Sequence, residues 1–238
     1  MRRRGNSLYL GGPFINQGQV GNSLSVPAVA AGSPAVLAGT VSTSDTVTAA
    51  TVNHSHTVPS GATYLCVAVH SFGNGISITG LTYSGNAMTV YKTPAITFRD
   101  TAICYLANPP AGTANVVISF SGTLGSALGV VGACFTTSSP GAREDEDLTT
   151  GNPTTSLSRT VTAGGDNRLV VGVLMGAASG ATSTPTGTGH VKAGETDMTA
   201  PGDEYVALSW APVGSGDYTL GWTLSPSGAY SMAVVVLP

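Results

Sequence analysis

Charged residues are scarce in this sequence. Asp, Glu, Lys and Arg together make up 9% of the 238 residues, whereas about a quarter is usual in globular proteins. Hydrophobic residues make up 42%, and a disordered chain would combine low hydrophobicity with high charge. The chain is therefore expected to fold, with its solubility resting on hydroxyl, amide and backbone groups or on burial against partners. Such a composition is typical of capsid, fibre and adhesin domains and unusual for globular enzymes.

Long apolar segments are also missing. No run approaches the roughly 18 apolar residues of a membrane helix, and Arg2–Arg4 precede a Gly-rich stretch rather than the apolar core of a signal peptide. The three cysteines, Cys66, Cys104 and Cys134, are an odd number without the spacing of a metal site. Because each lies in an apolar stretch, we expect buried free thiols and folding in a reducing cytoplasm.

Motifs that identify a reaction are missing as well. The sequence has no nucleophile elbow, P-loop or complete dinucleotide-binding glycine motif. A glycosidase would need two facing carboxylates, but the candidates lie mostly in predicted turns or at strand ends, where acids are usually solvated. These candidates are Asp100, Asp166, Glu195, Asp197, Asp203 and Glu204. The sequence therefore predicts a protein that is not an enzyme and that binds no cofactor.

What the sequence does contain is an internal repeat. Residues 103–113 and then 116–122 read as an aromatic-ended strand, a Pro/Gly turn and an alternating strand, and residues 207–216 and then 218–225 repeat this order. In the first copy Val116, Ile118 and Phe120 share one face, the period of 2 of a half-buried antiparallel strand. We interpret the repeat as a hairpin that occurs once in each half of an all-β body.

Strand-like segments with turn residues between them continue to the end of the chain, and helix formers such as Glu, Lys and Gln are scarce. We therefore predict an all-β fold, an antiparallel two-sheet β-sandwich of jelly-roll type, with an extended N-terminal arm over residues 1–44. The predicted strands are 46–53, 63–70, 76–83, 87–91, 97–107, 114–120, 127–136, 156–162, 168–175, 204–210, 218–224 and 231–237.

The predicted domain is a single sandwich over residues 45–238, built from two similar halves, 45–137 and 156–238. The second half lacks an evident counterpart of residues 76–91. We expect an acidic loop at 138–155 and a long, exposed polar loop at 179–201.

Two groups of residues are candidate metal ligands. His54 and His56 would point to the same face of a strand and could meet one ion, for example on an oligomer axis; the alternative is a polar pair on an exposed strand end. Glu144–Asp147 could gather calcium, but the spacing of an EF-hand loop is absent. A solvated acidic loop, or an acidic partner for a neighbour's arginines, is the alternative. We assign no metal site; His70 and His190 show no partner pattern.

The aromatic and basic residues offer limited support for ligand binding. Trp210 and Trp222 lie on the two strands of one predicted hairpin, and core packing is the favoured interpretation. Three of the nine basic residues stand at the N-terminus and the rest of the chain is acidic, so the arm would suit docking on a neighbouring subunit; a solvated terminus is the alternative. The predicted assembly contacts are Arg2, Arg3, Arg4, Leu8, Leu10 and Phe14.

Three segments, residues 58–69, 78–89 and 105–113, together resemble a β-sandwich module of tailed-bacteriophage virion proteins and some bacterial surface proteins. The resemblance covers roughly residues 45–238 and implies a non-enzymatic structural or adhesive part. Our first hypothesis is a capsid decoration, cementing or head-fibre protein, anchored by its N-terminal arm to other virion proteins and to copies of itself. The alternative is a tail-fibre or tail-tip adhesin that binds a host glycan. We expect a virion location after assembly in the host cytoplasm, without membrane or nucleic-acid partners.

Overall fold

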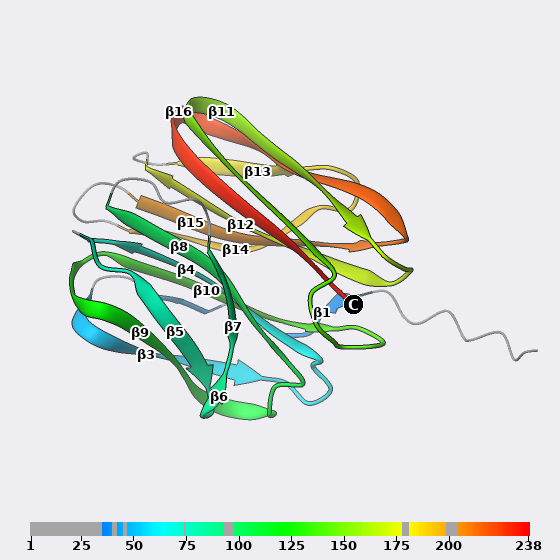
Figure 1. Cartoon of the computed structure of the whole chain (residues 1–238), viewed down its shortest axis with the longest axis horizontal. Helices are drawn as coiled ribbons and strands as arrows, with labels where there is room; N and C mark the ends of the chain where they lie inside the picture. Colours follow the sequence, from blue (N-terminus) through cyan, green and yellow to red (C-terminus); the bar gives the residue numbers. More distant parts are fainter. Residues whose placement is uncertain are drawn as a thin grey trace, which may run out of the picture. The chain divides into compact units, whose positions relative to one another are not determined.

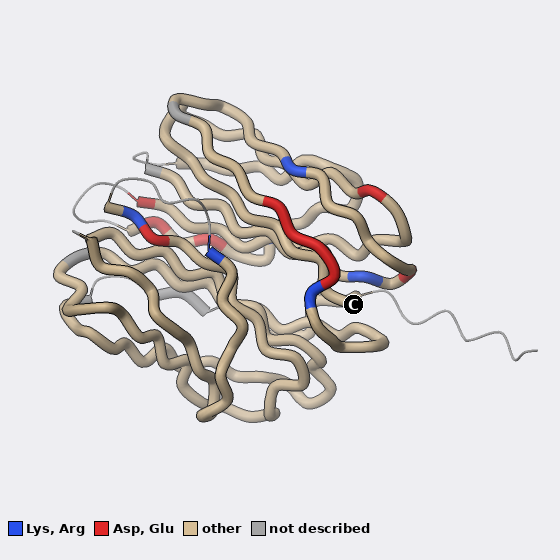
Figure 2. The backbone as a smooth tube through the Cα atoms, viewed as in Figure 1, with Lys and Arg blue, Asp and Glu red and all other residues tan. Residues whose placement is uncertain are grey.

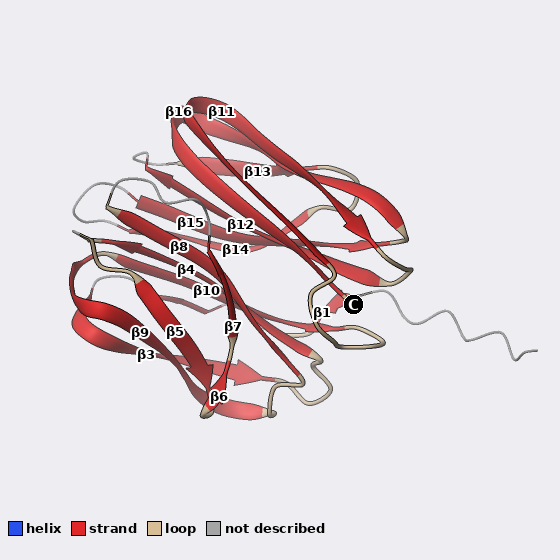
Figure 3. Cartoon of the chain, in the orientation of Figure 1, coloured by secondary structure: helices blue, strands red, loops and turns tan. Residues whose placement is uncertain are grey.

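The computed structural model describes residues 35–39, 42–44, 47–73, 75–92, 98–177, 181–198 and 204–238, which belong to one compact unit, Ala31–Pro238. The regular secondary structure in these ranges is β-strand (Figure 3), so the predicted all-β antiparallel fold is confirmed. Within the same ranges, no helix is long and apolar enough to cross a membrane. The predicted arm lies outside the described residues up to residue 34, and so do Arg2, Arg3, Arg4, Leu8, Leu10 and Phe14.

The first half of the described chain forms two antiparallel sheets (Figure 1). One sheet has the order β1-β10-β4-β8-β7, with β2 also paired to β10, and the other has the order β3-β9-β5-β6. The strands are β1 (Val36–Leu37), β2 (Ser42–Ser44), β3 (Val47–Val58), β4 (Tyr64–Phe72), β5 (Ile78–Tyr83), β6 (Asn86–Ala87), β7 (Thr89–Lys92), β8 (Arg99–Ala107), β9 (Gly112–Ser126) and β10 (Leu128–Thr136).

The second half forms one sheet whose two longest strands take part in two layers. The start of β11 pairs with the end of β16, while the end of β11 pairs with the start of β16. The order is β11-β16-β12-β15-β14, with β13 paired to the start of β16. The strands are β11 (Asp145–Ala163), β12 (Arg168–Ala177), β13 (Thr182–Thr186), β14 (Val191–Met198), β15 (Glu204–Val213) and β16 (Gly216–Leu237).

Both halves follow the strand order of a jelly roll. In the first half, the order β1/β2, β10, β4, β8 faces the order β3, β9, β5. The second half repeats both orders. The order of the first sheet recurs as the start of β11, the end of β16, β12 and β15. The order of the facing sheet recurs as the end of β11, the start of β16 and β13. The repeat in the sequence is therefore part of a repeat of the whole topology.

Three apolar clusters hold these layers together. The first lies between the two sheets of the first half and the third lies within the second half. The second cluster joins the halves, because it contains residues of β4, β8 and β10 together with residues of β12, β15 and β16. We call the two sheets that meet at this cluster the inner sheets and the remaining layers the outer sheets. The inner sheet of the first half is β1/β2-β10-β4-β8-β7. The inner sheet of the second half consists of the start of β11, the end of β16, β12, β15 and β14.

The two kinds of sheet have different sequence patterns for this reason. An inner strand is covered on both faces, so β4 and β10 are buried at eight of their nine positions. An outer strand alternates between the apolar cluster and solvent, as β3 does from Thr51 to Val58. The sequence predicted two sheets, whereas the described residues form three. That the stacked halves behave as one domain stays a prediction.

Two predicted loops contain strands. Residues 138–155 include the start of β11, and residues 179–201 include β13 and β14, which occupy the places that β5 and β7 have in the first half. The second half therefore does have a counterpart of residues 76–91, contrary to the sequence analysis. The pattern was missed because β13 and β14 carry few apolar side chains and gain their order from pairing with β16 and β15.

The repeated hairpin is also corrected by the structure. β8 pairs with β4 and β7, whereas β9 pairs with β3 and β5. The Pro/Gly turn therefore carries the chain from an inner to an outer sheet, and the same holds for the turn between β15 and β16. Each outer strand begins at a glycine with a left-handed backbone, Gly112 with φ 115° and Gly216 with φ 111°, a conformation that other residues adopt only with strain.

Candidate functional site

Two ionisable side chains are buried where the two inner sheets meet. His70 on β4 and Glu204 on β15 are 0% and 1% exposed, and His70 Nε2 lies 3.0 Å from Glu204 Oε2. A carboxylate only accepts hydrogen bonds, so the imidazole is the donor in this pair. On its other side His70 Nδ1 lies 2.7 Å from the hydroxyl of Thr101 on β8. One chain of polar contacts thus joins the first half to the second.

Arg99, the first residue of β8, completes this cluster. Its Nε donates to both carboxylate oxygens of Glu204 at 3.0 Å, and its NH2 group lies 2.8 Å from Oε1. The guanidinium also lies 5.3 Å from the ring centre of Phe72. Burial acts to raise the pKa of Glu204, but the hydrogen bonds from His70 and Arg99 and their charges outweigh it, so the pKa is lowered. Glu204 is therefore held as a carboxylate.

The order hydroxyl, imidazole, carboxylate is that of a catalytic triad, but two features of the cluster speak against that use. Thr101 is 1% exposed, so a substrate would have to displace the packed sheets to reach its hydroxyl. The carboxylate is also neutralised directly by Arg99. The arrangement is suited to holding the halves together, because breaking a buried charged pair leaves an uncompensated charge.

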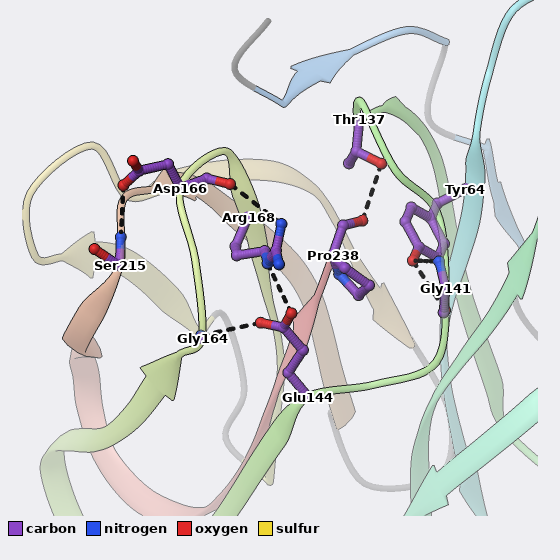
Figure 4. Close-up of polar contacts among 9 residues, drawn as sticks. All are labelled: Tyr64, Thr137, Gly141, Glu144, Gly164, Asp166, Arg168, Ser215 and Pro238. Carbon is purple, nitrogen blue, oxygen red and sulfur yellow. Dashed lines mark hydrogen bonds and ion pairs between the residues drawn. The ribbon is translucent and has the colours of Figure 1, made fainter. Parts of the chain in front are cut away.

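A second set of polar contacts ties the segment between the halves to the body (Figure 4). The hydroxyl of Tyr64 lies 3.0 Å from the carbonyl oxygen and 2.7 Å from the amide nitrogen of Gly141. The hydroxyl of Thr137 donates to the carbonyl of Pro238, the last residue, at 3.0 Å. Burial is the main reason that the pKa of Tyr64 is raised to about 12. These contacts hold the connection between the halves against β4 of the first half and against the residue that follows β16 of the second half.

The acidic run Glu144–Asp147 lies at the start of β11 (Figure 2) and is paired within the chain. Glu144 accepts from Arg168 Nε at 2.8 Å and from the amide of Gly164 at 3.1 Å, as Figure 4 shows. Glu146 pairs with Arg143, and Asp147 lies 3.6 Å from Arg159. Asp145 accepts from the amide of Thr162 at 2.6 Å. The run leads into a strand, and three of its four side chains have arginine partners, so it is not a free acidic loop.

His54 and His56 lie on one face of β3, as predicted, but that face points into the first half. Both side chains are buried, and His56 Nε2 lies 3.3 Å from the Sγ of Cys134. Burial lowers the pKa of His54, and burial together with the nearby His54 lowers the pKa of His56 to about 4. The exposed strand end of the sequence analysis is therefore wrong. Among the described residues, no group of three or more His, Cys, Asp or Glu could hold a metal ion.

Four of the candidate carboxylates contact basic, amide or hydroxyl groups. Glu204 binds His70 and Arg99, and Asp100 accepts from Lys92 Nζ and from the amide of Ile78, each at 2.7 Å. The other contacts are Asp166 with the amide of Ser215 at 3.1 Å and Glu195 with Lys192 and Tyr205. Asp203 lies outside the described residues.

Other predictions concern the interior. Cys66, Cys104 and Cys134 are free and buried, as predicted, and burial raises the pKa of each thiol. Trp222 is buried in the core of the second half, and Trp210 packs against Phe135 with 5.5 Å between ring centres, so core packing is confirmed for both.

The partners of His70 were not predicted, although a histidine directly after an apolar run was the available signal. Compared with protein-family models, with curated proteins and with solved structures, the chain matches none of them. By its fold, the chain is an all-β protein with several antiparallel sheets.

Proposed function

We propose that this protein is a non-enzymatic structural component of a bacteriophage virion, a capsid decoration, cementing or head-fibre protein. The observation that carries the proposal is the outer sheet of the first half, β3-β9-β5-β6, whose strands contain no Asp, Glu, Lys or Arg. Its solvent face presents hydroxyl and amide groups. These exposed residues are Thr51, Asn53, Ser55, Thr57, Thr113, Asn115 and Thr79.

Such a face is suited to burial in an assembly. Removing a charge from water costs much more than removing a hydroxyl or amide that finds a new hydrogen-bond partner, and the centres of protein interfaces are depleted in charged residues. Figure 2 shows this sheet without charged residues, while the acidic and basic residues lie on other strands and on loops. The jelly-roll order adds support, because viral capsid domains use it, as does the resemblance of residues 45–238 to phage virion modules.

The test places charge on this face without disturbing the core. Ser55 and Asn115 are exposed cross-strand neighbours, so Ser55→Lys/Asn115→Lys should leave the fold intact and abolish incorporation into particles. Ser138→Lys, at an exposed position between the halves, is the matched control and should incorporate normally. Virions purified from cells that express a tagged copy give the measurement. Absence of the wild-type protein from virions would refute the proposed function, and normal incorporation of the double variant would refute the role of this face.

The N-terminal arm has a separate test. Because β1 begins at Val36 and pairs with β10, a deletion of residues 2–34 leaves the described strands complete. We expect the shortened protein to fold with an unchanged melting temperature and to fail to enter particles. Normal incorporation of the shortened protein would show that the arm does not anchor it.

A second candidate function, a tail adhesin for a host glycan, is favoured by one feature. Phe98, just before β8, is 54% exposed and has a left-handed φ of 64°, a strained backbone for a bulky residue that often marks a functional position. It is followed in the sequence by Arg99 and Asp100, and Asp100 pairs with Lys92, so ionisable groups come directly after the exposed ring. Glycan-array binding that Phe98→Ala removes would support this function, and an array without signal for wild type would refute it.

A further inference from the structure

Two pairs of strands from the inner sheets meet in the manner of a symmetric dimer, although they belong to one chain. β4 of the first half faces β15 of the second, and β8 of the first half faces β12 of the second. By topology, β12 is the counterpart of β4 and β15 is the counterpart of β8. These two contacts use the same two strands of each half and are related as in an isologous, two-fold interface. The strand β10 of the first half also meets β14 and β15 of the second, so the two-fold relation covers only part of the interface.

The strand pairing gives the correspondence residue by residue when one equal step relates both strands of the first half to those of the second. Tyr64 pairs with Ala107 and Phe135, while Leu169 pairs with Pro212 and Leu237. Tyr64 and Leu169 both lie in the cluster between the halves. The step from Tyr64 to Leu169 and the step from Ala107 to Pro212 are both 105 residues.

The same step of 105 residues carries Arg99 to Glu204. The ion pair that links the halves therefore joins two equivalent positions, which have opposite charge. The surroundings differ in the same way: His70 corresponds to Met175, and Thr101 corresponds to Val206. The polar partners of the carboxylate are thus all supplied by the first half.

This distribution makes only one pairing of halves favourable. Two first halves would place arginine opposite arginine without a carboxylate, and two second halves would place glutamate opposite glutamate among apolar side chains. A buried charge without a partner is strongly unfavourable, and building like charges against the wrong partner is a known source of specificity. The apolar cluster adds no charge to this distinction: the first half contributes mainly aromatic and small side chains to it, and the second half mainly Val and Leu.

We propose that the opposite charges of Arg99 and Glu204 determine which halves can pair with each other. The inner face of the first half is built to bind the inner face of a second half, from its own chain or from a second copy of this chain, and to reject a copy of itself. The proposal goes beyond the proposed virion function and does not depend on it.

Full-length charge-reversal variants test the first part. Arg99→Glu and Glu204→Arg should each lower the melting temperature by about 10 °C, and the double variant should recover most of that loss. A double variant no more stable than the single variants would overturn the proposal. If a single variant does not fold alone, recovery of soluble protein in the double variant gives the same answer.

The second part is tested by refolding Arg99→Glu and Glu204→Arg together after denaturation. Exchange of halves between the two chains restores a Glu–Arg pair at both interfaces, so a mixed dimer should form that neither variant gives alone. Native mass spectrometry of differently tagged chains measures it. The matched control is Arg168→Glu with Glu144→Arg, because both residues of this pair lie on the same side of the connection and exchange cannot rescue them. No mixed dimer, or an equal amount from the control mixture, would overturn exchange between copies.

Discussion

Acid should destabilise the first half through His56. The pKa of this buried side chain is about 4, below its usual value of 6.5, so the unfolded chain binds the proton more readily than the folded chain. The stability that this group contributes is complete above pH 6.5, falls as the pH drops toward 4, and is lost below that. At 1.36 kcal/mol per pKa unit, the shift corresponds to about 3 kcal/mol, a substantial part of the roughly 5–15 kcal/mol of a typical protein.

The test compares urea unfolding of wild type and His56→Met at pH 7.5, 6 and 4.5. Wild type should lose about 2 to 3 kcal/mol more than the variant between the first and last pH, because carboxylates titrate equally in both. Met is apolar and fills a similar space beside Cys134, the contact of the imidazole. Ser55→Met, on the exposed face of the same strand, controls for the substitution itself and should keep the wild-type slope. Parallel curves for wild type and His56→Met would refute the reasoning.

Three further changes test other parts of the fold by the same unfolding measurement. Glu204→Gln should cost about 3–5 kcal/mol by leaving Arg99 without its charge partner, and a loss below 1 kcal/mol would contradict the buried pair. Gly129→Ala should cost about 1–3 kcal/mol, because an added Cβ would lie 2.7 Å from a side chain of the facing sheet, whereas Gly125→Ala has open space and should cost less. Arg159→Ala, at a half-exposed ion pair, should change stability by less than about 1 kcal/mol.

The outer strands were predicted well from sequence because their burial alternates. Val116, Ile118 and Phe120 face the apolar cluster of the first half, and Leu220, Trp222 and Leu224 face that of the second. In such strands the alternation between core and solvent appears in the sequence as a hydrophobic period of 2. The segments that the sequence marked as strands therefore coincide with parts of β9 and β16.

The edge strands could not be predicted in the same way. β13 buries Ser183 rather than an apolar residue, and β14 is deeply buried only at Met198. Their order comes from hydrogen bonds to a neighbouring strand, which leave no hydrophobic pattern. The start of β11 was hidden for a related reason, because its acidic residues are typical of a loop unless their arginine partners are known.

The stacking of the halves could have been predicted from two signals. Residues 65–69 are apolar without interruption, which indicates a strand buried on both faces. Such a strand needs a layer on each side, and a single sandwich provides only one. Aligning the two copies of the repeat with a step of 105 residues would also have aligned Arg99 with Glu204. These signals indicate a further layer and two equivalent positions, but not that the two side chains touch, because the contact depends on which faces of the inner sheets meet.

The division between inner and outer sheets limits where partners can bind. The inner sheets are closed against each other by an apolar cluster and by the His70–Glu204–Arg99 contacts, so a partner reaches them only by separating the halves. The outer sheets and the strand ends remain as binding surfaces. Of these, the β3-β9-β5-β6 sheet contains no Asp, Glu, Lys or Arg. Recognition on this face must rely on shape and on hydrogen bonds to hydroxyls and amides. Salt screens charge interactions, so contacts of this kind should depend little on ionic strength.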